Sequence, residues 1–141
     1  MSCKLNPYLN FEGSCEEAFT LYAQAFGGQP QYLRMGDMPD VPEQYKDKIM
    51  HVALKVGGDT LMGSDVLPGC GLPFARGNNQ YVTIHPADKA EADRLFALLS
   101  QGGAVEMPMS DQFFGYFGSF TDRFGVAWMI HVAASECGCT D

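Results

Sequence analysis

The sequence predicts an α+β protein made of two tandem modules, each with the element order β-α-β-β-β. Each half of the 141-residue chain has one amphipathic segment that starts at a helix-capping residue and ends at two glycines. Glycine-containing turns join short alternating segments after each helix. The two helix starts, Ser14 and Asp88, lie 74 positions apart, and the residues after them match in type. A repeat that occurs only twice indicates a pseudo-symmetric pair of modules rather than a solenoid.

The first module is expected to contain one helix and four strands. Ser14 and Glu17 have the spacing of a capping box, and the apolar stripe that follows them ends at Gly27-Gly28. Alternation and strand-like composition predict strands over residues 5–11, 30–35, 50–56 and 60–64. Residues 37–48 hold two prolines and several charges, which predicts a mobile loop with one helical turn at 42–45.

The same order of elements is expected in the second module. Asp88 and Glu91 open its helix, and Gly102-Gly103 end it. Strands are predicted over residues 80–85, 104–109, 114–121 and 126–132, the last two joined by a tight turn at 122–125. The predicted boundaries are therefore a first module at 1–66, a glycine- and proline-rich linker at 67–79, a second module at 80–134 and a flexible tail at 135–141.

Each module should carry its helix on one face of its sheet and leave the other face bare. Two bare faces can then form a curved mixed sheet around a shared cleft. Alternation along the first strand predicts that Leu9 and Phe11 face the helix. Tyr8 and Asn10 would then line the cleft. Trp128, the only tryptophan, is expected on the helix-facing side of the last strand.

The composition excludes several functions. The net charge of −8 argues against a nucleic-acid partner, because phosphate binding needs clustered lysine and arginine. No run of apolar residues is long enough to span a membrane. The first residues lack an apolar signal segment, which predicts a cytoplasmic protein.

Five cysteines occur, Cys3, Cys15, Cys70, Cys137 and Cys139. Their odd number and the lack of a signal segment predict reduced thiols. Cys137 and Cys139 could bind a soft metal or close a strained disulfide, but one pair lacks the four ligands of a closed zinc site. A frayed tail with two free thiols is the simpler expectation.

Five short segments spread over nearly the whole chain occur in an order and at spacings typical of one superfamily. They are Pro7-Tyr-Leu-Asn-Phe-Glu-Gly13, Glu17-Ala-Phe-Thr-Leu-Tyr-Ala-Gln-Ala-Phe-Gly-Gly28, His51-Val-Ala-Leu54, Leu61-Met-Gly-Ser-Asp65 and Asp122-Arg-Phe-Gly-Val-Ala-Trp128. The chain resembles the vicinal oxygen chelate superfamily, which includes glyoxalase I, extradiol dioxygenases and bleomycin resistance proteins. Within it, the sequence looks closest to the PhnB-like group, also labelled 3-demethylubiquinone methyltransferase-like. The resemblance implies a glyoxalase/bleomycin resistance-like fold.

The resemblance also implies a divalent metal held by four side chains, one from the first and one from the last strand of each module. Alternation and the distance from the turn glycines put these positions at Asn6, Met62, Tyr81 and Met129. Counting back from the helix cap would give Pro7 instead of Asn6. Two thioethers, a phenol and an amide do not match the oxygen and imidazole ligands of such a metal. We therefore expect no metal and no cofactor, and interpret these four residues, with Tyr8 and Asn10, as the lining of a pocket for a small organic ligand.

Alternation puts all three histidines, His51, His85 and His131, on the cleft side. One of them could act as a general base near neutral pH, and His51 and His131 are the candidates for a catalytic role. Three imidazoles together could instead bind a metal at a shifted position. The simpler interpretation is that they are partly solvated polar residues that line a groove.

Three functions remain open at this point. The first is metal-free binding of a small organic molecule, and the second is a metal-dependent or histidine-based lyase, isomerase or oxygenase. The third is methyl transfer, as the group label suggests, but no G-x-G-x-x-G loop follows the first strand. The aromatic pair Phe113-Phe114 is a candidate contact for a homodimer.

Overall fold

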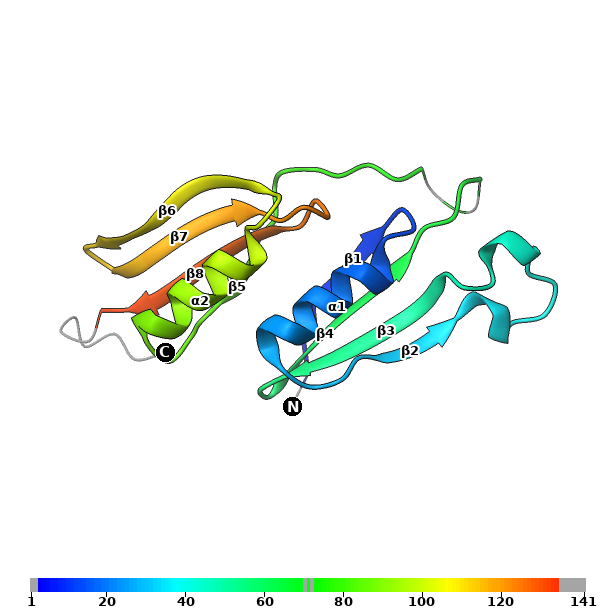
Figure 1. Ribbon diagram of the computed structural model, residues 1–141, viewed down its shortest axis with the longest axis horizontal. Coiled ribbons are helices and arrows are strands. Elements are labelled where there is room, and N and C mark those ends of the chain that lie inside the picture. Colours follow the sequence, from blue (N-terminus) through cyan, green and yellow to red (C-terminus); the bar gives the residue numbers. More distant parts are fainter. Residues whose placement is uncertain (1–2, 70, 72, 135–141) are drawn as a thin grey trace. The chain divides into compact units, whose positions relative to one another are not determined.

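The computed structural model describes residues 3–69, 71 and 73–134, so the predictions for Cys70, Cys137 and Cys139 lie outside the described residues. The chain divides into two compact units, Met1–Ala75 and Arg76–Asp141. Each unit has the element order β-α-β-β-β and one four-stranded mixed sheet, which confirms the predicted α+β class (Figure 1). The finer boundaries, with a linker over 67–79, stay a prediction.

The sheet of the first unit has the strand order β1-β4-β3-β2. Its elements are β1 (Tyr8–Phe11), α1 (Cys15–Phe26), β2 (Gln31–Arg34), the 3₁₀ helices η1 (Met35–Asp37) and η2 (Glu43–Tyr45), β3 (Ile49–Val56) and β4 (Asp59–Asp65). Strand β1 pairs with β4 in parallel, and the other neighbours are antiparallel. The helical turn predicted at 42–45 is confirmed by η2.

The sheet of the second unit has the equivalent order β5-β8-β7-β6. Its elements are β5 (Val82–Ile84), α2 (Lys89–Leu99), β6 (Ala104–Gln112), β7 (Gly115–Thr121) and β8 (Ala127–Ala133). Again the first strand of the unit pairs in parallel with the last, and the other pairs are antiparallel. No helix in the described part of the chain is long and apolar enough to cross a membrane.

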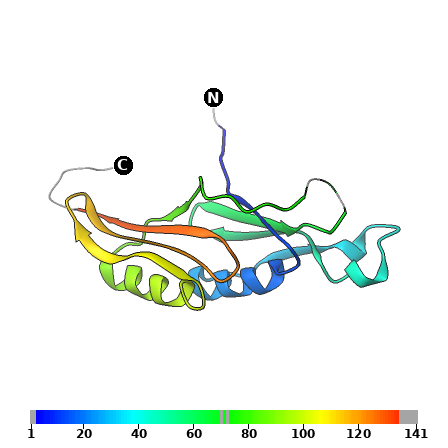
Figure 2. The same cartoon turned by 90° about the horizontal axis from the view of Figure 1, so that it is seen from above.

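Each helix lies against one face of its own sheet (Figure 2). In the first unit, the ring of Phe19 on α1 meets Phe11 of β1 edge to face, with 6.2 Å between the ring centroids. Both side chains are almost fully buried. A Cβ atom added at Gly63 of β4 would lie 2.8 Å from the Phe19 ring, so only glycine permits this close approach of strand and helix. The predicted orientation of Phe11 toward the helix is confirmed.

The core of the second unit is built around the last strand, as the alternation predicts. Trp128 and Ile130 of β8 are at most 1% exposed. Phe120 on the neighbouring strand β7 packs edge to face on Phe96 of α2, with 5.0 Å between the centroids. Burial of such side chains supplies most of the free energy that holds the helix on the sheet.

The capping box predicted at Ser14 is wrong, because the Ser14 side chain makes no capping hydrogen bond. Asp65, which lies at the end of β4 and 50 positions after Cys15 in the sequence, accepts the first amide of the helix instead. One carboxylate oxygen accepts the backbone N–H of Cys15 at 3.0 Å, and the other accepts that of Ile49 at 2.9 Å. Asp65 is only 6% exposed. A carboxylate is a good acceptor at a helix start, and its charge also complements the helix dipole. At the second helix, the predicted Asp88 cap is confirmed by its bond to the Glu91 amide.

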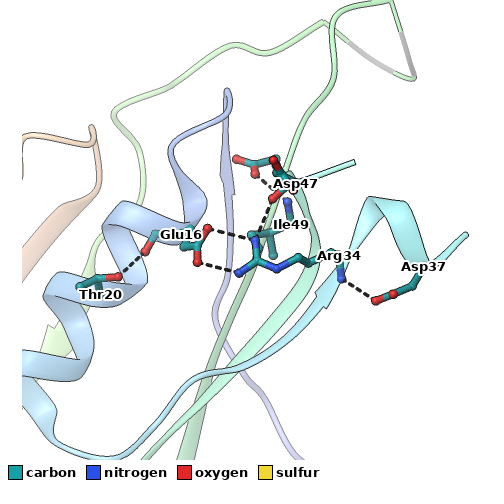
Figure 3. A network of polar contacts seen from close by, with 7 residues as sticks. Glu16, Thr20, Arg34, Asp37, Asp47 and Ile49 are labelled. Atoms are coloured by element: carbon teal, nitrogen blue, oxygen red, sulfur yellow. Dashed lines mark hydrogen bonds and ion pairs between the residues drawn. The ribbon is translucent and has the colours of Figure 1, made fainter. Parts of the chain in front are cut away.

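Arg34, at the end of β2, ties α1 to the irregular segment before β3 (Figure 3). Its guanidinium donates to both carboxylate oxygens of Glu16, at 3.0 and 2.7 Å. It also donates to the backbone carbonyl of Asp47 at 2.8 Å. A register shift between Leu33 and Arg34 accompanies this contact, and Ile49 at the start of β3 is fully buried.

Asp122 fixes the turn between β7 and β8. One of its oxygens accepts the backbone N–H groups of Phe124 and Val126 at 2.9 and 3.0 Å. The other accepts the indole N–H of Trp128 at 2.9 Å. With 3% exposure, this carboxylate joins the turn directly to the core of the second unit.

Candidate functional site

The first candidate surface is the face of the first sheet that α1 leaves uncovered, called here open face 1. In the sheet register Tyr8 pairs with Met62, Met62 pairs with Ala53, and Asn10 pairs with Ser64. The alternate residues of β4 are buried toward the helix, which leaves Met62 on the opposite side. The structure therefore brings Tyr8, Asn10 and Met62 together, as predicted from the alternation.

A phenol and an imidazole meet on open face 1. The Tyr8 hydroxyl lies 3.1 Å from Nδ1 of His51 on β3, and the two ring centroids are 5.6 Å apart. Tyr8 is 46% exposed. Beside them, the Ser64 hydroxyl donates to the amide oxygen of Asn10 at 3.3 Å. This hydrogen-bonded pair can orient the imidazole, so that His51 presents a fixed ring to a molecule above the sheet.

Asn6 does not belong to a strand. The predicted strand over 5–11 is shorter at its start, since β1 begins at Tyr8. Asn6 is exposed and lies two positions before Tyr8, so strand alternation would put it on the same side as open face 1. It does not take part in the strand pairing. Its inclusion among the strand-borne residues was therefore wrong, and its role as a ligand contact stays a prediction.

The second candidate surface is the face of the second sheet opposite α2, called here open face 2. Thr83 pairs with Met129, and Met129 pairs with Ser119. The neighbours of Met129 on β8, Trp128 and Ile130, are buried toward the helix. Met129 and His131 therefore lie on the open face, in the orientation that the alternation predicts.

The sequence interpretation missed the polar centre of open face 2. The carboxylate of Glu106 on β6 accepts a hydrogen bond from the Tyr81 hydroxyl at 2.8 Å and one from the Ser119 hydroxyl at 3.2 Å. The hydrogen bond between Tyr81 and Glu106 is the main reason that the pKa of the Tyr81 hydroxyl is raised above its ordinary value. Ser119 is only 4% exposed, so the contact starts deep in the sheet. The sequence feature that could have indicated this site is the charged residue Glu106 within the predicted strand over 104–109.

A register shift explains why alternation could not place Glu106. Val105 pairs with Phe120 and Met107 pairs with Ser119, which are consecutive residues of β7 in reverse order. Glu106 is therefore an extra residue of β6 with no partner in the pairing. Such a bulge rotates the strand and re-aims the inserted side chain. Glu106 is consequently turned toward Ser119.

Two of the three histidines come together on the second unit. The rings of His85 and His131 are 5.6 Å apart between centroids. Nε2 of His131 lies 3.1 Å from the backbone carbonyl of Phe114. Because a carbonyl only accepts, Nε2 is the donor, and Nδ1 is left as the acceptor when the ring is neutral. His51 belongs to the first unit and is not part of this cluster.

The residues at the implied metal positions do not fit a divalent cation. Each open face contributes a thioether, Met62 or Met129, where a hard metal needs oxygen or imidazole. Tyr81 is engaged with Glu106. Within the described ranges, no group of three or more histidine, cysteine, aspartate or glutamate side chains is arranged to hold a metal ion.

Comparison with known proteins gives this geometry a family. A family model described as 3-demethylubiquinone-9 3-methyltransferase matches residues 3–131. The chain belongs to that family. It is 29% identical over 145 residues to Protein YjdN of Escherichia coli (strain K12), an alignment that covers 94% of this chain and 97% of that protein.

Solved structures agree with this family. Protein PA1353 from Pseudomonas aeruginosa is 44% identical, with a TM-score of 0.86 over 94% of this chain and 98% of that one. A Bacillus cereus PhnB protein, named a putative 3-demethylubiquinone-9 3-methyltransferase, is 25% identical, with a TM-score of 0.75 over 93% of this chain and 100% of that one. A glyoxylase/bleomycin resistance protein/dioxygenase domain from Frankia, 16% identical with a TM-score of 0.64 over 95% and 99% of the two chains, shares the fold. The chain thus has the glyoxalase/bleomycin resistance-like fold that the resemblance implied.

The family description implies S-adenosylmethionine as a methyl donor, and neither α1 nor α2 follows the G-x-G-x-x-G turn that commonly holds a nucleotide cofactor. Nucleotide cofactors are commonly held by a glycine-rich turn and the free N–H groups of a helix start. At α1 the amide of Cys15 is already bound by the Asp65 carboxylate. The turn before it is bound by Lys48, whose ammonium donates to the Gly13 carbonyl at 3.1 Å. At α2 the amide of Glu91 is bound by Asp88.

Proposed function

We propose that this protein binds a small organic molecule on its open sheet faces without the help of a metal ion. The observation that carries the proposal is the chemistry of the implied metal positions, where Met62 and Met129 replace ionic ligands. Methionine side chains are flexible and polarizable, and they suit the wall of an organic-ligand site. The polar groups beside them, Tyr8 with His51 and Tyr81 with Glu106, supply a few fixed hydrogen-bonding groups.

A ligand screen by thermal unfolding tests this proposal. The protein is unfolded with and without each compound of a small organic library, in buffer that contains EDTA. A ligand present at a hundred times its Kd stabilises the folded state by about 2.7 kcal/mol, which raises the unfolding temperature measurably. If no compound stabilises the metal-free protein while a divalent cation alone does, the proposal is wrong.

Two variants locate the binding. Met62→Lys and Met129→Lys put a charge at the centre of each open face and should abolish stabilisation by a library compound. Met38→Lys is the matched control, because Met38 is also partly exposed but follows η1, away from the strands. Equal loss of stabilisation in all three variants would show that the effect does not arise on the open faces.

We propose acid–base catalysis as the second candidate function, because Tyr8 and Nδ1 of His51 form a hydrogen-bonded pair. In a lyase or isomerase, His51 would take a proton from the ligand and Tyr8 would hold the ring in place. His131 is the equivalent candidate on open face 2. For any substrate that the screen uncovers, His51→Ala or His131→Ala should abolish turnover but not binding. Unchanged turnover in both variants would exclude this role.

We also propose that the protein forms a homodimer through the turn between β6 and β7. Phe113 is 92% exposed there, and its ring packs on Phe114. Exposed aromatic pairs of this kind usually meet a partner surface. Sedimentation of the protein and of the Phe113→Ser variant tests this: the variant should dissociate at a concentration where the parent is dimeric, and a monomeric parent would refute the contact.

A further inference from the structure

We propose that Tyr81, Glu106 and Ser119 form a subsite on open face 2 that binds the protonated amine of a ligand with an apolar or aromatic body. This inference rests on the proposed binding function and adds a ligand class to it. The three side chains come from three different segments of the second unit, namely the residue before β5, strand β6 and strand β7. Nothing in the family description concerns them.

The hydrogen bonds leave one carboxylate oxygen available. Tyr81 and Ser119 both donate to Oε1 of Glu106, at 2.8 and 3.2 Å. Oε2 accepts no hydrogen bond from a described residue. Two donors on one oxygen hold the carboxylate in a single orientation, so that Oε2 is presented to an incoming donor at little further entropy cost.

The charge of this carboxylate is not compensated within the described part of the chain. The donors, a phenol and a hydroxyl, are neutral. Among the described residues of the second unit, the ion pairs of Lys89 with Asp111 and of Arg94 with Glu91 do not involve Glu106. A fixed carboxylate without a cation partner favours a cationic ligand, and hydrogen bonds to charged groups are stronger than neutral ones. An anionic ligand would be repelled from the same place.

The surroundings indicate the rest of the ligand. Met129 pairs with Ser119 in the sheet, so its thioether lies on the strand next to the hydroxyl that donates to Glu106. The Tyr81 ring is 40% exposed and adds an aromatic face that also attracts cations. A site with one carboxylate, one aromatic ring and one thioether matches an arylalkylamine better than a polyamine, since a polyamine would need further carboxylates.

The test compares three probes of equal size, namely benzylamine, benzyl alcohol and benzoate, by NMR titration of the full chain at neutral pH. We expect benzylamine to bind at least about tenfold more tightly than benzyl alcohol, because a hydrogen bond between two charged groups is stronger than one with a neutral donor. Benzoate should not bind at Glu106. The ¹³C signal of the Glu106 carboxylate should shift with benzylamine in the unsubstituted protein, a result that depends on no variant.

Glu106→Gln keeps the shape of the side chain and removes the charge, so it should lose the preference for benzylamine and keep the affinity for benzyl alcohol. Glu91→Gln on α2 makes the same change of net charge in the same unit and should alter neither affinity. If benzylamine and benzyl alcohol bind equally to the parent protein, or if Glu106→Gln binds benzylamine as tightly as the parent, the amine subsite is refuted while the proposed binding function stands. If none of the three probes shifts the signals of Met62 or Met129, and the library screen also finds no ligand, both proposals are refuted.

Discussion

Replacing Asp122 by asparagine should destabilise the second unit by about 2–4 kcal/mol. The carboxylate accepts two backbone N–H groups on one oxygen and the indole N–H of Trp128 on the other. An asparagine has one acceptor and one donor end in the same space. Whichever way the amide turns, at least one buried N–H group faces another donor.

The magnitude follows from which orientation is cheaper. If the amide oxygen serves the two backbone groups, only the indole N–H loses its acceptor. A buried donor without a partner costs about 1–3 kcal/mol, and the remaining bonds lose the assistance of the charge. The opposite orientation leaves two backbone N–H groups unpaired and costs more. With Asp122 at 3% exposure, water cannot replace the lost acceptor.

Urea unfolding followed by tryptophan fluorescence measures this change. Trp128 is the only tryptophan, so fluorescence reports on the second unit. With a slope of about 1–3 kcal/mol per molar urea, the midpoint should fall by roughly 0.7 M or more. Asp59→Asn is the control, because Asp59 is exposed at the start of β4 and should change the midpoint little. An Asp122→Asn midpoint equal to that of the parent would refute the assigned role of this carboxylate.

Burial, more than the nearby Asp65 and Glu16, raises the pKa of the Cys15 thiol to about 12. Alkylation of the native protein near pH ~8 should therefore leave the Cys15 peptide unmodified in mass spectra, because the thiolate is the reactive form. Rapid labelling of Cys15 would contradict its buried position. The hydrogen bond from Arg34 lowers the pKa of Glu16. Because the pKa of Glu16 is lower in the folded than in the unfolded protein, the ion pair stabilises the fold at pH values above the unfolded-state pKa. This stabilisation is lost as the pH falls through the folded-state pKa. Since the pair is partly exposed, the free energy of unfolding of the parent and of Glu16→Gln should differ by less than about 1 kcal/mol at neutral pH and by nothing in acid. A difference that grows in acid would contradict this. Gly63→Ala should cost about 2 kcal/mol in urea unfolding, since its Cβ would lie 2.8 Å from the Leu9 carbonyl and the Phe19 ring; an unchanged midpoint would show that β4 and α1 can separate freely.

The elements that the sequence predicted well are those set by local alternation. Trp128 and Ile130 lie toward the helix, and Met129 and His131 lie on the open face, because successive strand residues point to opposite sides. The same rule placed Tyr8 and Met62. Local periodicity is sufficient wherever a strand is regular and one of its faces is buried.

The residues that the sequence could not place depend on contacts between distant segments. Asp65 caps a helix that begins 50 positions earlier, and no local pattern announces it. Glu106 meets a tyrosine 25 positions away and reaches the open face through a register shift in β6. The sequence predicts that Ser14 caps the first helix, but the buried carboxylate of Asp65 on β4 accepts the first amide of that helix instead. Tertiary contacts of this kind override local preferences.

The most direct test of a metal-free organic site on the open faces is methyl NMR of the methionines. Protein labelled with ¹³C at the methionine methyl groups is titrated in EDTA with the compounds that raise the unfolding temperature. Ligand binding should shift the signal of Met62, of Met129 or of both, and leave that of Met35, which is 8% exposed in η1, unchanged. Shifts that appear only after a divalent cation is added, or that spare both Met62 and Met129, would contradict the account.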